Sequence, residues 1–245
     1  VLEHLFDHAD FPTVLANLRE EDESMPNWAI GHKILTTKKN TRIALIGLTA
    51  AYPMTYGPNH WHVKMLGSTM DKELAKINGQ YDMLILITHI GLKMDRWLAK
   101  NYPQIDLIVG GHSHDLIVQG EKVDHTWITQ TGKWGNYVGD IHVELEDHHV
   151  TKIVPNTVAT ASMPEEPEDE SVIKGYYEKG KQLLSERKVA KLPEKFADDK
   201  IAAVQVSLDA IADFAKTDLA ILSSGLFLTP FKSGILTQFD LQNAL

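Results

Sequence analysis

The sequence of 245 residues contains no cysteine. This absence excludes a disulfide framework, zinc sites built from thiolates, and cysteine nucleophiles. It does not decide the compartment, because secreted proteins can also lack cysteine. Cytoplasmic, cell-surface and secreted locations therefore all stay open.

Long apolar runs are also absent. No run approaches the roughly 20 residues that a helix needs to cross a bilayer, so we expect no membrane span. The first residues, Val1 to Asp10, lack the basic segment followed by an apolar one that is typical of a secretory leader.

Positive charge is scarce, with 24 Lys and Arg against 33 Asp and Glu and a formal net charge of -9. Such a chain is electrostatically unsuited to holding a nucleic acid polymer, and we expect none as a partner. A phosphorylated small molecule would need local positive charge. Bound divalent cations could supply it.

Three apolar runs rich in branched residues predict buried strands, at Thr41 to Leu48, Asp82 to His89 and Ile105 to Gly111. Helical spacing at Thr69 to Asn78 and at Met94 to Tyr102 places a helix between each pair of strands. This alternation predicts a layered α/β sheet domain.

An alternating apolar pattern then predicts an antiparallel hairpin. Its first strand lies within Asn136 to Asp147, and the chain returns as Val150 to Val154. We expect this hairpin to close a first domain that spans residues 1–162.

A stretch rich in proline and carboxylates, Met163 to Glu170, begins a predicted linker and helix over residues 163–190. Beyond it, Lys200 to Phe214 has the spacing of an amphipathic helix, and Asp218 to Gly225 predicts a short buried strand. We expect residues 191–245 to form the beginning of a second, α+β domain.

Histidines stand where two of the predicted strands end. His89 closes one strand, and Gly110 and Gly111 lead from the next into His112 and His114. Ligands bind at the carboxyl ends of strands in open α/β sheets. In an extended segment His112 and His114 would point to the same side while Ser113 faces away, and neutral imidazoles bind zinc, manganese or iron. The three histidines therefore predict a metal site, and hydrogen-bonded loop residues are the alternative interpretation.

The segments around these histidines resemble a known family. ITHIGLKMD at Ile87 to Asp95 and IDLIVGGHSHD at Ile105 to Asp115 are similar, in order and spacing, to two blocks of the 5'-nucleotidase branch of the calcineurin-like metallophosphoesterases. This branch includes UDP-sugar hydrolases and 2',3'-cyclic phosphodiesterases. The resemblance extends to FPTVLANL, RIALIGLT and QTGKWGNYVGDIHVEL, and implies a layered metal-bearing domain joined by a long helix to a nucleotide-recognising domain.

The resemblance assigns metal contacts to His89, His112 and His114, and it implies two divalent ions, of manganese, zinc or iron. Asp115 would orient a ligand histidine as a hydrogen-bond acceptor. The family's other ligands, with the bridging aspartate and the histidine that protonates the leaving group, come from blocks before Phe11. None of these blocks is present. The chain resembles the middle of such an enzyme, with its sheet domain incomplete at the N-terminus, and we expect it to be a poor catalyst by itself.

A second departure lies at Leu228. The segment Ser223 to Leu241 resembles a family block in which an arginine stands at the position of Leu228. An arginine could hold phosphate through two parallel hydrogen bonds and a leucine cannot, so the usual grip on a nucleoside monophosphate is missing.

Other polar residues have competing interpretations. Asn17 could face the site or serve as a turn or cap residue. His60 and His62 flank Trp61 and could contact substrate, although loop residues are the plainer interpretation. We interpret the remaining candidates as structural or solvated, namely His125, His142, His148 and His149.

Two functions from different classes follow. The first is metal-assisted hydrolysis of a nucleotide or a related phosphate ester, in which the ions polarise the phosphoryl oxygen and activate a water. The second is a noncatalytic binding or scaffold module that keeps the fold. The three histidines favour the enzyme, whereas the missing blocks and Leu228 favour the scaffold.

Overall fold

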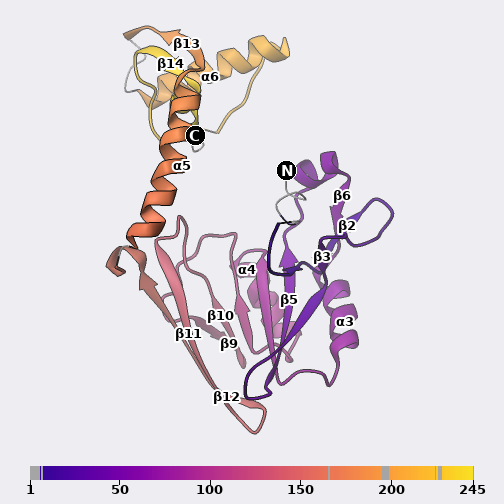
Figure 1. Cartoon of the computed structure of the whole chain (residues 1–245). Coiled ribbons are helices and arrows are strands. Elements are labelled where there is room, and N and C mark those ends of the chain that lie inside the picture. The colour runs from indigo at the N-terminus through magenta and orange to yellow at the C-terminus, as the bar shows by residue number, and fades with distance from the viewer. Residues whose placement is uncertain are drawn as a thin grey trace. The chain divides into compact units, whose positions relative to one another are not determined.

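A computed structural model describes residues 6, 8–164, 166–194, 199–223, 225 and 228–244. The chain divides into two compact units, Val1–Met163 and Pro164–Leu245 (Figure 1). Each unit contains a hydrophobic core of its own.

The first unit is built on a six-stranded sheet with the order β4-β5-β7-β8-β10-β9. Neighbouring strands from β5 to β10 are parallel, whereas β4 and β9 pair antiparallel at the two edges. The predicted layered α/β sheet is confirmed. Its strands are β4 (His32–Thr36), β5 (Arg42–Thr49), β7 (Met83–His89), β8 (Leu107–Val109), β9 (Glu121–Val123) and β10 (Thr126–Thr129).

Two helices cover one face of this sheet, α3 (Leu66–Ile77) and α4 (Leu92–Asn101). Met70 and Leu98 from these helices share a buried cluster with Leu86 of β7. Both helices begin earlier than their spacing predicted, α3 by three residues and α4 by two. Neither start carries a side-chain cap, so the sequence held no capping signal there.

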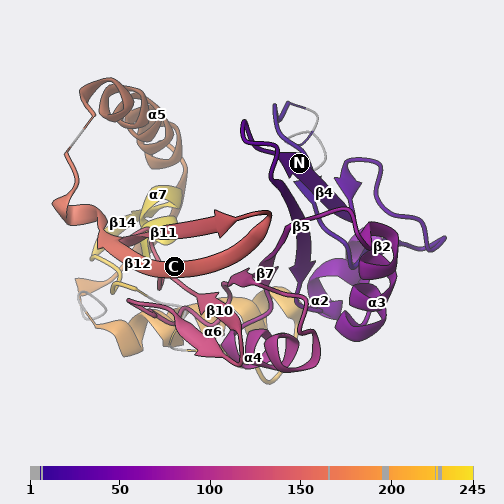
Figure 2. The same cartoon turned by 90° about the horizontal axis from the view of Figure 1, so that it is seen from below.

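The predicted hairpin is confirmed as β11 (Tyr137–Glu146) and β12 (His149–Ala159), which pair antiparallel. Ile153 of β12 packs with Met83 and Leu107, from the face of the sheet opposite α3 and α4. Figure 2 shows the hairpin on that side. The sheet is therefore the middle of three layers.

Short elements complete the first unit. β1 pairs with β3 and β2 pairs with β6, outside the main sheet. Their bounds are β1 (Thr13–Val14), β2 (Leu18–Glu20), β3 (Ala29–Ile30), β6 (Trp61–Val63), the helix α2 (Pro53–Tyr56), and the 3-10 turns η1 (Gly57–Asn59) and η2 (Thr160–Ser162).

The second unit contains three helices and a two-stranded antiparallel sheet in its described residues. They are α5 (Pro167–Ser185), β13 (Lys188–Leu192), α6 (Lys200–Ala215), β14 (Gly234–Thr237) and α7 (Gln238–Ala244). The helix predicted at Lys200 to Phe214 is confirmed by α6. Within the described part of the chain, no helix is both long enough and apolar enough to cross a bilayer.

The strand predicted at Asp218 to Gly225 is wrong for the residues that the structure describes, 218–223 and 225. Leu219 and Ile221 are 75% and 86% exposed. A strand needs a neighbour to bond with, and β13 pairs with β14 instead. Apolar character alone did not create a strand here.

Candidate metal site

The site begins where parallel strands end together. Thr49 and His89 are the last residues of β5 and β7 and lie opposite each other in the register. Strand β8 ends at Val109 on the same edge, and the chain continues through Gly110 and Gly111. His89 is exposed at this edge, as its position at a strand end predicted.

His112 lies beside His89. Their ring centroids are 5.1 Å apart with the planes tilted by 57°. Gly111 permits this approach, because a Cβ on it would lie 3.4 Å from Nδ1 of His89. The N–H of Gly91 donates to the carbonyl of Gly111 at 3.1 Å and joins the two segments directly. The structure thus brings two of the three predicted histidines together.

The segment around His114 differs from expectation. We predicted an extended run in which His112 and His114 share a side, but their φ angles are +85° and +60°. Both residues occupy the left-handed region, where side chains do not alternate as they do in a strand. His114 is exposed. The prediction from alternation was wrong, and a metal contact by His114 stays a prediction.

Tyr52 is a neighbour of His112 that the sequence did not reveal. Its hydroxyl lies 2.7 Å from Nε2 and 2.9 Å from Nδ1 of His112, and it bonds to one nitrogen at a time. Tyr52 follows the end of β5 by three residues, so it stands at the same sheet edge as His89. That position was the available signal.

Asp115 forms a hydrogen bond with Ser113. The Ser113 hydroxyl donates to Oδ2 of Asp115 at 2.6 Å and accepts from the N–H of Leu92, at the start of α4, at 3.0 Å. Asp115 therefore holds Ser113, which separates His112 from His114. That Asp115 orients a ligand histidine directly stays a prediction.

A buried polar network lies behind the histidines. Asp95 of α4 accepts hydrogen bonds from the Thr88 hydroxyl at 2.6 Å and from Nε2 of Gln130 at 3.1 Å. Burial raises the pKa of Asp95 above its ordinary range, and these two hydrogen bonds oppose the shift. From the sequence we assigned no role to Asp95 or Gln130. The available signal was an aspartate on the apolar side of a predicted helix.

The other candidates bond to partners outside this pair. Asn17 is fully buried, and its side-chain amide exchanges hydrogen bonds with the backbone of Thr49 at 2.8 and 3.0 Å, so its polar atoms are used structurally. His60 and His62 contact Glu21 and Glu23 at 2.6 and 3.0 Å. His62 lies in β6 rather than in a loop, which corrects our expectation for that residue.

Four histidines stay outside the site, as we interpreted them. They are His125 before β10, His142 on β11, His148 in the hairpin turn at 3.3 Å from Asp82, and His149 at the start of β12. Leu228 belongs to the second unit and is 59% exposed.

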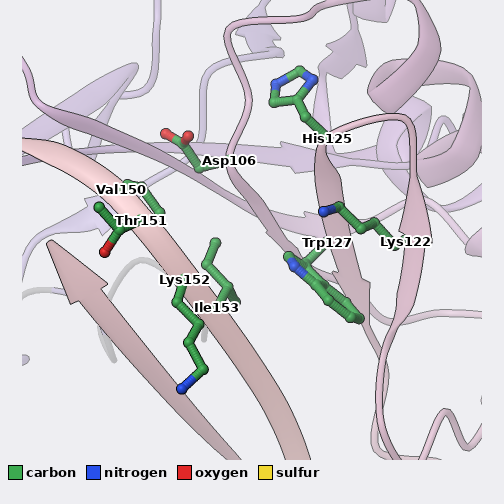
Figure 3. Close-up of a pocket in the computed structure, with 8 residues that line it drawn as sticks. All are labelled: Asp106, Lys122, His125, Trp127, Val150, Thr151, Lys152 and Ile153. Atoms are coloured by element: carbon green, nitrogen blue, oxygen red, sulfur yellow. The ribbon is translucent and has the colours of Figure 1, made fainter.

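A cavity of about 370 Å³ opens at the opposite edge of the sheet. Asp106 and His125, which line it, directly precede β8 and β10 and so mark the amino ends of those strands. Figure 3 shows Lys122 and Trp127 on one side of this cavity and residues of β12 on the other. Burial raises the pKa of Asp106. This cavity is separate from the histidine pair.

The residues present fit a divalent ion only in part. Two neutral imidazoles are suitable ligands, and zinc in proteins takes four. Among the residues that the structure describes, no group of three histidine or carboxylate side chains is arranged to hold an ion. His89 and His112 alone would therefore supply only part of the ligands that such an ion needs.

Known proteins with similar sequences are phosphoesterases. No family model matches the chain. The metallophosphoesterase YunD of Bacillus subtilis, itself described as uncharacterized, is 27% identical over 243 residues, which cover 97% of this chain and 52% of YunD. The trifunctional nucleotide phosphoesterase YfkN of the same organism is 27% identical over 149 residues, 60% of this chain and 9% of YfkN. Over almost its whole length the chain is thus similar to a metallophosphoesterase.

The fold of the chain is similar to that of solved 5'-nucleotidases. A 5'-nucleotidase precursor from Thermus thermophilus matches with a TM-score of 0.75 at 16% identity, covering the whole of this chain and 54% of that one. The NAD nucleotidase of Haemophilus influenzae matches with a TM-score of 0.67 at 15% identity, over the whole of this chain and 56% of that one. The chain thus spans about half the length of these two proteins. Metallophosphoesterases as a family use divalent metal ions.

Proposed function

We propose that this chain contributes to a metal-dependent phosphoesterase that hydrolyses nucleotides or related phosphate esters. His89, His112 and His114 would hold divalent ions of manganese, zinc or iron. The observation that carries the proposal is the contact between the rings of His89 and His112, at 5.1 Å, where parallel strands end. Two imidazoles that meet at the ligand-binding edge of an α/β sheet are the start of a metal ligand set.

The charge of the chain supports a role for metal ions in substrate binding. A net charge of -9 repels a phosphate ester, so binding needs a local concentration of positive charge. Divalent ions at the histidine edge would provide it and would orient the ester. A complete two-metal centre needs more ligands than His89, His112 and His114, and carboxylate oxygens are the usual bridge.

The domain assignment is part of the same proposal. We assign residues 1–162 to the metallophosphoesterase domain, 163–190 to a linker and helix, and 191–245 to the beginning of a nucleotide-recognising domain. The division of the chain at Met163 and the 19-residue helix α5 support this assignment. Names such as nucleotide phosphoesterase and NAD nucleotidase among the relatives support a nucleotide as substrate.

A noncatalytic scaffold is the second candidate. It is favoured by Leu228, which offers an exposed apolar side chain where the family places a guanidinium. It is also favoured by the partial ligand set among the described residues. A scaffold would keep the fold without binding ions at the histidine edge. A measurement of ion binding therefore distinguishes the two candidates.

The test is a calorimetric titration of the chain with Mn²⁺ and with Zn²⁺, combined with assays of AMP and of a generic phosphodiester in the presence of each ion. We expect His112→Ala to weaken ion binding at least about tenfold, because it removes a direct ligand. His142→Ala is the matched control, since His142 is an exposed histidine on β11 outside the site. It should bind like the wild type.

Each outcome decides between the candidates. Ion binding that His112→Ala weakens and His142→Ala preserves supports the enzyme. Metal-dependent hydrolysis that follows the same pattern supports it further. Absence of ion binding in the wild type, or binding that is equal in all three proteins, contradicts the proposed site and leaves the scaffold.

A further inference from the structure

One buried carboxylate connects the two segments that carry the paired histidines. Asp95 is fully buried in the first turn of α4. Its Oδ1 accepts from the hydroxyl of Thr88, the residue directly before His89, at 2.6 Å. Its Oδ2 accepts from Nε2 of Gln130 at 3.1 Å. One carboxylate oxygen of Asp95 therefore bonds to the neighbour of His89, and the other bonds to Gln130.

Gln130 carries the connection to His112. Its Nε2 also donates to the carbonyl of Gly111 at 3.3 Å, and its Oε1 lies 3.2 Å from the hydroxyl of Ser113. Gly111 and Ser113 are the residues on either side of His112. The orientation of the amide is fixed, because the two groups that face its nitrogen, Asp95 and Gly111, are both acceptors.

The network has little room to rearrange. A Cβ on Gly110 would lie 2.4 Å from Oδ2 of Asp95 and 3.1 Å from Nε2 of Gln130, so the backbone passes directly over the carboxylate. Thr88 and Gln130 are 5% and 2% exposed. Within the described residues no cation pairs with Asp95, so its hydrogen bonds come from uncharged donors. Loss of a partner in such a buried network leaves a polar group with an uncompensated desolvation penalty.

The backbone at His112 is strained, and this network can hold it in that conformation. A histidine with φ of +85° adopts a conformation that other contacts must impose. Gln130 supplies such contacts on both sides of His112. Its Nε2 donates to the carbonyl of Gly111, and its Oε1 lies within hydrogen-bond distance of the Ser113 hydroxyl, which shares its one proton between Gln130 and Asp115. Without these contacts the loop would relax toward an ordinary backbone conformation, and the ring of His112 would leave that of His89.

We propose that Asp95 is a positioning residue that, through Thr88 and Gln130, fixes the distance between the rings of His89 and His112. It touches neither ring. The effect of Asp95 on ion binding rests on the proposed function. Its effect on the distance between the two rings can be tested in the metal-free chain. A chain that binds no ion would still show whether Asp95 sets the geometry of the pair.

The first test is histidine-ring NMR of the metal-free chain. Thr88→Val removes the hydroxyl while preserving shape, and it leaves Oδ1 of Asp95 buried without its donor. We expect it to shift the ring resonances of His89 and His112 and to weaken the NOE between the two rings. Thr88→Ser keeps a hydroxyl and should restore both signals. The resonances of His142 and His149, on the hairpin, should stay in place.

Thr126→Val is the matched structural control. Thr126 is fully buried, and its hydroxyl donates to the carbonyl of Ile105 at 2.7 Å, near the opposite edge of the sheet. The substitution removes the same chemical group with a comparable loss of stability. We expect no change in the His89 and His112 signals. Equal changes in Thr88→Val and Thr126→Val would overturn the proposal, because they would reflect general destabilisation.

Gln130→Met removes the hydrogen bonds between Asp95 and the segment of His112. It is an independent test in case the Thr88 variants do not fold. It should shift His112 more than His89, because Gln130 contacts the residues on either side of His112 directly and reaches the neighbour of His89 only through Asp95. A second readout is the affinity for Zn²⁺, which should fall about 10- to 100-fold in Thr88→Val and in Gln130→Met, as for other residues that orient metal ligands. Unchanged ring signals in both variants would contradict the positional role, whereas a wild type that fails to bind Zn²⁺ would contradict only the proposed function.

Discussion

Glu73 illustrates how one residue can stabilise the first unit. It lies on α3 with its side chain 1% exposed, and it accepts hydrogen bonds from Lys76 and His32 at 2.7 Å each. Burial raises the pKa of Glu73, but the bonds from Lys76 and His32 outweigh it and hold the pKa below its ordinary value. We predict that Glu73→Gln lowers the free energy of unfolding at pH 7 by about 2 kcal/mol, the loss typical of a hydrogen bond to a buried charge.

The effect of Glu73→Gln should depend on pH. A carboxylate with a lowered pKa in the folded state stabilises the fold fully above its unfolded pKa, about 4.3, and this contribution is lost as the pH falls through the folded value. Urea titrations at pH 7 and near pH 3 would measure it, with the wild type and the variant converging at low pH. Glu144→Gln is the control, because Glu144 bonds to Lys152 at an exposed position and should contribute little. A gap between wild type and Glu73→Gln that is constant with pH would contradict the role of the charge.

At this same scale, the sequence predicted that His89 and His112 meet at the edge of the sheet. The positions of His89 and His112 followed from strand ends and a glycine pair, and these signals are local. Tyr52 and Gln130 come from segments that are distant along the chain, and only the pairing of β5, β7, β8 and β10 brings them to the histidines. The left-handed backbone at His114 also has no signal in the sequence, since glycine is the usual residue there.

At the scale of elements, the crossing of β1 and β5 depends on Gly47. A Cβ on Gly47 would lie 1.8 Å from the carbonyl oxygen of Val14, and the Gly47 carbonyl accepts from the N–H of Ala16 at 2.8 Å. We predict that Gly47→Ala destabilises the chain by more than about 2 kcal/mol, because one of the two backbone segments must move. Thermal unfolding followed by tryptophan fluorescence would measure the loss.

A second glycine provides the control for this prediction. Gly139 on β11 has no positive φ, and a Cβ on it would have its nearest atom at 3.5 Å, an ordinary contact, so Gly139→Ala should leave the unfolding temperature nearly unchanged. Similar losses in both variants would show that the contact with Val14 is not the cause.

Elements with strong periodicity were predicted well, and those that depend on a partner were not. The hairpin and α6 carry their pattern within their own residues, and the structure confirms both. The apolar run at 218–223 has the composition of a strand, but no described strand pairs with it. β14 (Gly234–Thr237) instead pairs with β13, and neither strand had been predicted. Pairing decides strands as much as composition does.

At the scale of the whole molecule, the two units differ in how much core they contain. The cluster in the first unit that joins the sheet to α3 and α4 has 15 buried residues, and a second one lies under the hairpin. The described core of the second unit has five, namely Leu192, Ala203, Phe231, Leu236 and Ala244. Because burial of apolar area is the main stabilising term, we expect the second unit to unfold first.

Two spectroscopic signals separate these events. All five tryptophans, Trp28, Trp61, Trp97, Trp127 and Trp134, lie in the first unit. The second unit holds 19, 16 and 7 residues in α5, α6 and α7, against 12 and 10 in α3 and α4 of the first. Fluorescence therefore reports the first unit, and circular dichroism at the helical minimum reports mainly the second. We predict that the helical signal is lost at a lower urea concentration than the fluorescence change.

Two core substitutions make this prediction decisive. Phe231→Ala, at a side chain 3% exposed, should move the early loss of helical signal to lower urea and leave the fluorescence transition in place. Leu86→Ala, at a fully buried position in β7, should do the reverse. If both signals instead change together in the wild type and shift together in both variants, the units unfold as one, and the chain would behave as a single cooperative body despite its separate cores.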